Sequence, residues 1–225
     1  MLKTLAPLAL LLVSHPANAQ TPAGAVEGDA ILKDFTFVSG EKLPELKMHF
    51  TTLGTPQRDN KGHVTNAVMI LHGTGGPGQL LDTAKYYIIL PDNIGHGGSS
   101  KPSDGMRMAF PKYDYDDMVA AQHRMLIEKF GVHKIKLILG TSMGCMHAFI
   151  WGVTRPAFAE KLAPFACLPV EIAGQNRMWR TLAIDAIKAD PLWQGGNYTT
   201  PPAAGLRTAA SLTLIAGANP YALQV

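Results

Sequence analysis

Three short, mainly apolar runs divide the first two thirds of the chain, at residues 67–71, 86–90 and 135–139. Each run is followed within two residues by glycine or proline. Runs of this length and setting are typical of strands buried on both faces of a parallel sheet. Upstream, residues 46–53 alternate between apolar and polar side chains, so together with residues 35–38 they predict a β-rich opening.

Helical patterns alternate with these runs. Apolar residues at helical spacing predict a helix that begins near Asp114, where a carboxylate can cap free amides, and ends at Gly131. A second helix is predicted at 143–154, before Pro156. Strands that alternate with helices imply right-handed crossovers, so we expect an α/β fold with a doubly wound, mostly parallel sheet.

The composition changes on both sides of this core, which we place at residues 30–170. The preceding stretch 22–29 is rich in small residues and predicts a flexible linker. Beyond the core, helical patterns at 176–189 and 206–216 indicate that residues 171–225 form the beginning of a helical lid.

The N-terminus has the pattern of a secretory signal peptide. Lys3 precedes an apolar run at 5–13, and Pro16 breaks the helix that this run would form. Ala17-Asn18-Ala19 supplies the small residues that signal peptidase requires. A retained membrane anchor is the alternative, but the apolar run is about half of the roughly twenty residues that span a bilayer. We therefore predict a signal peptide at 1–19, cleavage after Ala19, and an exported protein, periplasmic or secreted.

Composition narrows the classes of partner. The chain has 47% hydrophobic and 16% charged residues, as ordinary globular proteins do, and its net charge of +3 comes from scattered lysines and arginines. The sequence contains no block of basic residues, so it gives no indication of nucleic acid or an anionic membrane as a partner. The two cysteines, Cys145 and Cys167, are expected to be buried thiols, although export would permit a disulfide. Their spacing fits no metal motif, and we predict no cofactor.

The strongest chemical signal is the G-x-S-x-G pattern at 140–144. It lies between a predicted buried strand and a predicted helix, which is the setting of a nucleophile elbow. Gly140 and Gly144 would leave room for a strained turn that presents Ser142, the predicted nucleophile. The same turn would aim the backbone N–H of Met143 at a developing oxyanion. The competing interpretation is a serine that only caps the helix.

A glycine-rich loop, His72 to Gly76, follows the first apolar run. Elbow enzymes take their second oxyanion donor from this loop, so we predict the N–H of Thr74, with Gly73 as the second choice. A phosphate-binding loop is rejected because no Gly-Lys-Ser/Thr follows and no dinucleotide spacing fits. His72, and His96 in a later glycine turn, are interpreted as loop-shaping residues rather than as bases.

These motifs resemble the homoserine O-acetyltransferase-like branch of the α/β-hydrolase superfamily. The resemblance rests on the glycine loop at 71–76, the elbow at 140–144, and an Asp-Pro-Leu-Trp-Gln-Gly-Gly-Asn-Tyr stretch at 190–198, followed by prolines at 201–202 and Gly-Leu at 205–206. It implies a serine nucleophile, a covalent acyl-enzyme, and transfer of the acyl group to homoserine or to water.

The resemblance covers residues 30 to 220, with departures at the elbow. Thr141 and Cys145 stand where acetyltransferases of this type usually carry glycine. A signal peptide also argues against acetyl-CoA as the acyl donor. We therefore expect an esterase-like hydrolase that acts on a small-molecule acyl substrate, with a homoserine O-acetyltransferase-like acyltransferase as the alternative. The oligomeric state is not predicted.

The sequence does not supply a complete catalytic triad. In this fold the acid and then the base follow the serine. After Ser142 the only histidine is His147, on the same predicted helix, and no histidine follows Asp185 or Asp190. Glu171 is a conceivable acid, although a hinge role suits its position better. We therefore expect the N-terminal portion of a hydrolase, without the C-terminal strands that carry the acid and base, and inactive by itself.

The connection between the first two apolar runs, residues 72–85, is unusually short. A parallel crossover with its helix usually needs at least ten to twelve residues, and this connection also contains the glycine loop. We therefore predict an internal deletion here. A non-catalytic fragment or pseudoenzyme is the third interpretation.

Overall fold

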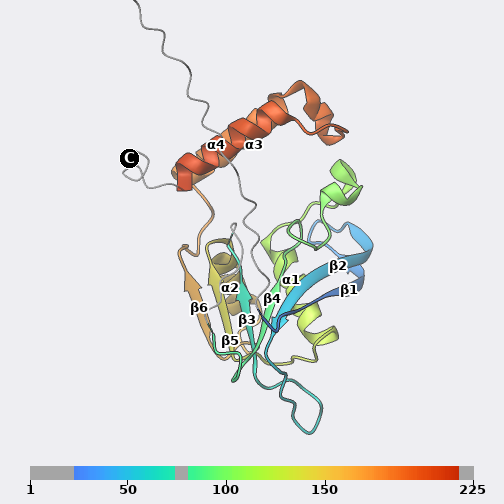
Figure 1. The fold of residues 1–225 in the computed structure, drawn as a ribbon, viewed down its shortest axis with the longest axis vertical. Coiled ribbons are helices and arrows are strands. Elements are labelled where there is room, and N and C mark those ends of the chain that lie inside the picture. The colour runs from blue at the N-terminus through green and yellow to red at the C-terminus, as the bar shows by residue number, and fades with distance from the viewer. Residues whose placement is uncertain (1–22, 74–80, 218–225) are drawn as a thin grey trace, which may run out of the picture.

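The computed structural model describes residues 23–73 and 81–217. In this part of the chain six strands form one mixed sheet in the order β1-β2-β4-β3-β5-β6 (Figure 1). Their bounds are β1 Val26–Thr36, β2 Lys42–Leu53, β3 Ala67–Leu71, β4 Tyr87–Pro91, β5 Leu137–Thr141 and β6 Leu162–Phe165.

Strands β4, β3, β5 and β6 run parallel to one another. Met69 of β3 lies opposite Ile89 of β4 on one side and opposite Ile138 of β5 on the other. β5 also pairs in parallel with β6, whereas β1 and β2 add an antiparallel hairpin to β4. The predicted mostly parallel α/β sheet is confirmed. The carboxyl ends of its strands meet at one edge, where such sheets place their sites.

The apolar runs locate three of these strands closely. β3 matches its prediction, β4 begins one residue later, and β5 begins two residues later. All residues of β3 and β4 are buried, as expected for strands covered on both faces. β5 starts late because Ile135 forms only an isolated bridge with Ala159.

The predicted linker at 22–29 is wrong, because Val26 to Asp29 belong to β1 and pair with β2 from Thr52 to His49. Small residues suit this strand for a packing reason. A Cβ atom on Gly28 would lie 2.8 Å from the Phe50 ring. The folded core therefore begins before residue 30.

The apolar pattern does not predict β6. This strand has four residues, includes Pro164, and has no buried side chain. Proline is tolerated in a strand that lies at the edge of a sheet, as β6 does in the described sheet. Backbone pairing with β5, rather than side-chain burial, defines this strand.

Helices follow the strands with the predicted alternation. Asp114 caps α1, since its Oδ1 accepts hydrogen bonds from Asp116 N at 2.9 Å and Asp117 N at 3.3 Å. α2 occupies the predicted range, and α3 and α4 begin two or three residues before theirs. The helix bounds are η1 Pro102–Asp104, η2 Arg107–Ala109, α1 Tyr115–Glu128, α2 Met143–Thr154, α3 Gly174–Ala189, η3 Pro191–Gly196 and α4 Ala203–Gly217.

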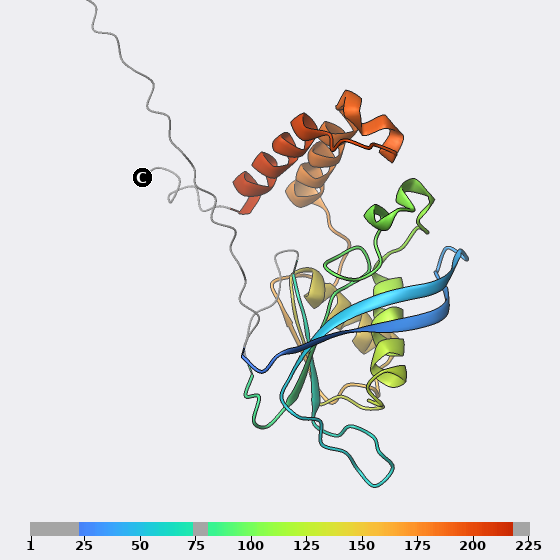
Figure 2. The same ribbon diagram turned by 45° about the vertical axis from the view of Figure 1, so that its right-hand side comes forward.

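α1 and α2 pack on the same face of the sheet (Figures 1 and 2). On that face Met69, Leu71 and Ile138 join the core with Val119 of α1 and Trp151 of α2. The opposite side chains of the strands form a second apolar cluster, which contacts Leu81 and Tyr86 rather than a described helix. Its buried members are Leu53, Val68, Ile70, Ile88, Leu90 and Leu139.

α3 and α4 form a helical hairpin beyond the carboxyl ends of the parallel strands (Figure 2). Asp190 closes it, because Oδ1 accepts a hydrogen bond from Leu192 N and Oδ2 accepts one from Gly205 N, both at 2.9 Å. These two backbone hydrogen bonds, first the one from Gly205, lower the pKa of the Asp190 carboxyl. A Cβ on Gly205 would lie 2.6 Å from Ala186 O, so glycine allows the helices to approach. None of the described helices is long and apolar enough to span a bilayer.

Candidate active site

Ser142 lies on a sharp turn between β5 and α2, at the carboxyl edge of the sheet. Its backbone has φ 54° and ψ −112°, in the positive-φ region that non-glycine residues rarely adopt. The turn is held on both sides, since Ser142 N donates to Phe165 O of β6 at 3.0 Å and Ser142 O accepts from Cys145 N at 3.1 Å. Such a conformation persists only where its surroundings fix it.

The two glycines of the elbow are required by close backbone contacts. A Cβ on Gly140 would collide with the carbonyl oxygen of Gly144. A Cβ on Gly144 would collide with the carbonyl oxygen of Leu71 in β3. The glycines therefore allow α2 to start directly against β5 and β3, as the sequence predicted.

The hydroxyl of Ser142 does not cap the helix. Ser142 stands at the N-cap position of α2, yet its side chain accepts no hydrogen bond from the first turn. Its Oγ forms no other hydrogen bond within the described residues. The interpretation of Ser142 as a simple capping serine therefore has no support in the geometry. Met143, the next residue, contributes the first amide of α2, which has no acceptor one helical turn earlier.

The glycine loop reaches the elbow through Gly73. A Cβ on Gly73 would lie 3.2 Å from Ser142 Cβ and 3.2 Å from Thr141 O, so the two backbones are in contact. Gly73 is therefore adjacent to the space in which a carbonyl bound to Ser142 would lie. Thr74, the first choice for the second oxyanion donor, lies outside the described residues.

Ser142 borders a small cavity of about 200 Å³. A larger, mainly apolar cavity of about 650 Å³ adjoins it, and Tyr115, Met146 and Leu168 line both. The segment between β6 and α3 supplies much of the wall. The serine is therefore accessible from a largely apolar hollow at the foot of the α3–α4 hairpin.

A buried polar chain lies next to this site, and the sequence analysis did not identify it. His72 Nδ1 donates to Gly73 O at 2.7 Å, which leaves Nε2 to accept from Asn93 Nδ2 at 3.3 Å. Gln122 of α1 donates to Asn93 Oδ1 at 2.5 Å and accepts from the indole of Trp151 at 2.8 Å. The chain thus links the glycine loop to α1 and α2.

His147 ends this chain as a buried imidazole. Its Nδ1 lies 3.4 Å from Gln122 Nε2, and its Nε2 has no hydrogen-bond partner among the described residues. Burial, reinforced by the positive charge that His72 and His96 can carry, lowers its pKa to about 3. His147 is therefore neutral at neutral pH and is held in the core, away from any role as a base.

No described histidine forms a hydrogen bond with Ser142. His72 shapes the glycine loop, and His96 Nδ1 contacts Ile94 O at 3.2 Å, so both have the structural roles expected for them. Asp190 closes the hairpin, as described above. In the described part of the chain no three His, Cys, Asp or Glu side chains cluster as metal ligands.

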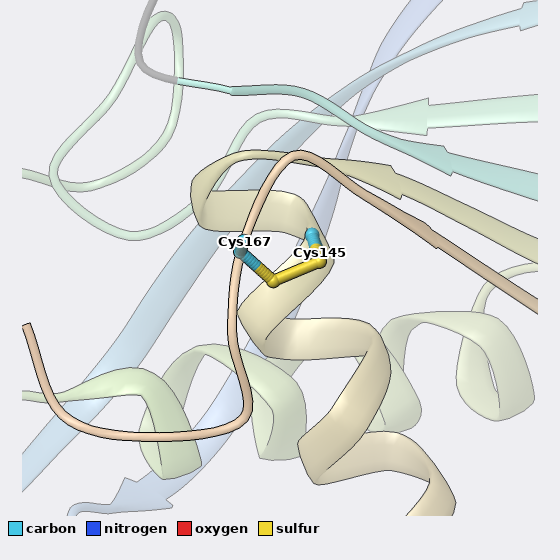
Figure 3. Close-up of a disulfide and its surroundings, with 2 residues drawn as sticks. All are labelled: Cys145 and Cys167. Carbon is cyan, nitrogen blue, oxygen red and sulfur yellow. A yellow bond between two sulfur atoms is a disulfide. The ribbon is translucent and has the colours of Figure 1, made fainter.

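The expectation of two buried thiols is wrong. Cys145 and Cys167 form a disulfide across the elbow (Figure 3). Cys145 lies in the first turn of α2, and Cys167 follows β6 by two residues. The pairing of β5 with β6 brings these two positions to the same edge of the sheet.

The chain is similar in sequence to proteins of a known family. The family model described as "alpha/beta hydrolase fold" matches residues 66–198. The chain belongs to this family. It is 32% identical over 200 residues to a probable acyltransferase of Methanothermobacter thermautotrophicus, with 83% of this chain and 61% of that protein covered. It is 31% identical over 233 residues to a homoserine O-acetyltransferase of Thermobifida fusca, with 86% and 60% covered.

A solved structure agrees with this α/β-hydrolase assignment. The acetyl esterase MekB matches with a TM-score of 0.77 at 27% identity, over 88% of this chain and 61% of that one. The resemblance to homoserine O-acetyltransferases is confirmed by these relatives. The chain spans about 60% of the length of the two curated relatives named above.

Proposed function

We propose that this α/β-hydrolase chain carries the nucleophile half of an exported, esterase-like acyl hydrolase. Ser142 attacks the ester carbonyl and forms an acyl-enzyme, which water then hydrolyses. The observation that carries the proposal is the elbow itself: a serine at φ 54° whose hydroxyl caps nothing and borders a cavity. A serine held in this way is poised for attack rather than for packing.

The oxyanion of the tetrahedral intermediate is held by backbone amides. The N–H of Met143 is the first donor, because it is the free first amide of α2. The second donor comes from the glycine loop, at Thr74 or Gly73. Contact between Gly73 and the elbow supports this assignment, since it places the loop beside Ser142.

The proton of the serine hydroxyl requires a base, and the described residues present none to it. We propose that the acid and base lie beyond Val225 in a longer form of the polypeptide. Support comes from the family order of serine, acid and base, and from the relatives, of which the chain covers about 60%. The 225-residue chain alone should then hydrolyse activated esters no faster than its Ser142→Ala variant.

A serine-directed fluorophosphonate tests the nucleophile in both forms of the protein. The longer form should label at Ser142, and Ser142→Ala should abolish labelling. Ser211→Ala is the matched control, because Ser211 Oγ donates to Arg207 O within α4, and it should label normally. Labelling that persists in Ser142→Ala would refute the elbow assignment. A longer form that does not label at all would support a non-catalytic protein instead.

Transfer to homoserine is the second candidate, favoured by the similarity to a homoserine O-acetyltransferase. Hydrolysis is preferred because Thr141 and Cys145 depart from the acetyltransferase elbow and because an exported protein would not meet acetyl-CoA. Supplying acetyl-CoA and homoserine to the longer form separates the two reactions by product. Export itself is tested by the N-terminal sequence of the mature protein, which should begin at Gln20.

A further inference from the structure

The segment 166–172, between β6 and α3, is weakly fixed by non-covalent contacts. Within the described chain it forms no hydrogen bond to the sheet, to α1 or to α2. Most of its side chains are exposed, with Leu168 at 69% and Val170 at 61%. Its first residue, Ala166, has φ 59°, a backbone conformation that costs energy outside glycine. Something other than hydrogen bonding must hold this segment in place.

The disulfide is the one covalent tether of this segment, and it is attached beside the nucleophile. Cys145 is fully buried in the first turn of α2, three residues after Ser142. Cys167 follows Phe165, whose carbonyl oxygen accepts the hydrogen bond from Ser142 N. The strained turn at Ala166 is therefore fixed on one side by the hydrogen bond to Phe165 O and on the other by the disulfide.

The same segment forms a wall of the serine cavity. Cys167 and Leu168 line the cavity together with Ser142 and Met146, and Arg180 reaches it from α3. α3 begins at Gly174, only seven residues after the disulfide. A displacement of the segment would therefore move both the cavity wall and the foot of the α3–α4 hairpin relative to Ser142.

We propose that the Cys145–Cys167 disulfide is a positioning element of the serine site, which fixes this wall and the foot of the hairpin to the helix of the nucleophile. In forming it, the two thiols lose two protons and two electrons to a protein or small-molecule disulfide, which is reduced to two thiols. Reduction frees the segment, so the shape of the cavity depends on the redox state. The proposal rests on the proposed function only in assigning the cavity to the acyl group.

Pulsed electron spin resonance on the full chain tests the tether directly. Nitroxides are carried on ketone-bearing non-canonical residues at positions 153 on α2 and 178 on α3, whose native side chains are 82% and 62% exposed. The measurement compares the oxidised protein, the protein reduced by dithiothreitol, and Cys145→Ser/Cys167→Ser. Dithiothreitol supplies the two hydrogen atoms and becomes a cyclic disulfide. A second pair at 178 and 214, within the hairpin, is the matched control.

Loss of the disulfide should broaden the 153–178 distance distribution and leave the 178–214 distribution unchanged. The same 153–178 distribution with and without the disulfide would overturn the proposal, because apolar contacts alone would then hold the wall. Broadening of both pairs would overturn it too, since the disulfide would then support the hairpin fold rather than its position. These distances do not depend on reaction at Ser142, so fluorophosphonate labelling reports separately on the proposed function.

In the longer form, fluorophosphonate labelling adds a measurement that would not change if the disulfide only stabilised the fold. Fluorophosphonates with a short and a long alkyl chain are compared by their second-order labelling rates. The ratio of the two rates should change at least several-fold when the disulfide is removed. An unchanged ratio, with both rates altered equally, would refute a role for the tether in shaping the cavity.

Discussion

Lowering the pH from about 8 to about 5 should destabilise the fold through His147, because this imidazole is buried between α1 and α2. Gln122 and the ring of Tyr115 face it from α1, and His72 and His96 act on it electrostatically. Burial, the largest cause, lowers its pKa from 6.5 to about 3. Protonation in the folded state is therefore strongly disfavoured.

The sign and size of the effect follow from linkage. Below pH 6.5 the denatured chain takes up a proton on this histidine, whereas the folded chain does not until the pH approaches about 3. The stability is thus fully present above the ordinary pKa and is lost as the pH falls between these values. At about pH 5, roughly 1.5 units below the ordinary pKa, the loss is about 2 kcal/mol in the free energy of unfolding.

Urea unfolding at about pH 8 and about pH 5 measures this loss. His147→Gln keeps a polar side chain beside Gln122 but does not titrate, so it should lose about 2 kcal/mol less than the wild type on acidification. The carboxylates titrate in both proteins and cancel in the comparison. His133→Gln, at an exposed histidine, should retain the wild-type dependence. Equal pH dependence in wild type and His147→Gln would refute the reasoning.

Three further predictions concern the elbow, its disulfide and the N-cap of α1. Gly144→Ala places a methyl group against the carbonyl of Leu71 and should therefore destabilise the fold by about 1–3 kcal/mol. It should also abolish fluorophosphonate labelling in the longer form. Unchanged labelling would show that the elbow tolerates a side chain at this position. Cys145→Ser/Cys167→Ser removes a cross-link between residues 22 apart and should lower the free energy of unfolding by about 3 kcal/mol, measured by urea titration against the oxidised wild type. Asp114→Ala removes the cap of α1 and should cost about 1 kcal/mol in the same assay, whereas Asp116→Ala, at an exposed residue that accepts no capping bond, should cost clearly less.

The parts of the fold that could be predicted are those where burial requires a recognisable pattern of apolar side chains. β3 and β4 are covered on both faces and therefore appear as continuous apolar runs. The bounds of α2 follow from the elbow glycines on one side and Pro156 on the other. The sequence predicts only the end of β1 and does not predict β6. Backbone pairing and small residues define these two strands, and such features do not produce a strong apolar pattern.

The candidate site, like the fold, was predictable only where a feature has a local sequence pattern. The elbow and the glycine loop carry their own sequence patterns, but the disulfide depends on a contact between two elements. Its prediction needed the pairing of β5 with β6, and β6 left no signal. The buried polar chain did leave one: Gln122 interrupts the apolar face of α1 formed by Met118 and Met125, and a polar residue there requires a buried partner.

The way the α3–α4 hairpin joins the sheet has a consequence for engineering and for divergence. The hairpin is closed internally by Asp190 and Gly205, and the connection that leads to it makes no backbone bond to the sheet. It also packs on the core through η2, where Met108 lies against Gly196 and Arg107 lies over the Tyr198 ring. The hairpin and η2 should therefore be exchanged together. A hairpin from a relative, grafted after Cys167, would keep the elbow and its tether while replacing the roof above the serine. Under the proposed function, such a chimaera in the longer form should label with a changed preference for the fluorophosphonate alkyl chain while its elbow stays the same.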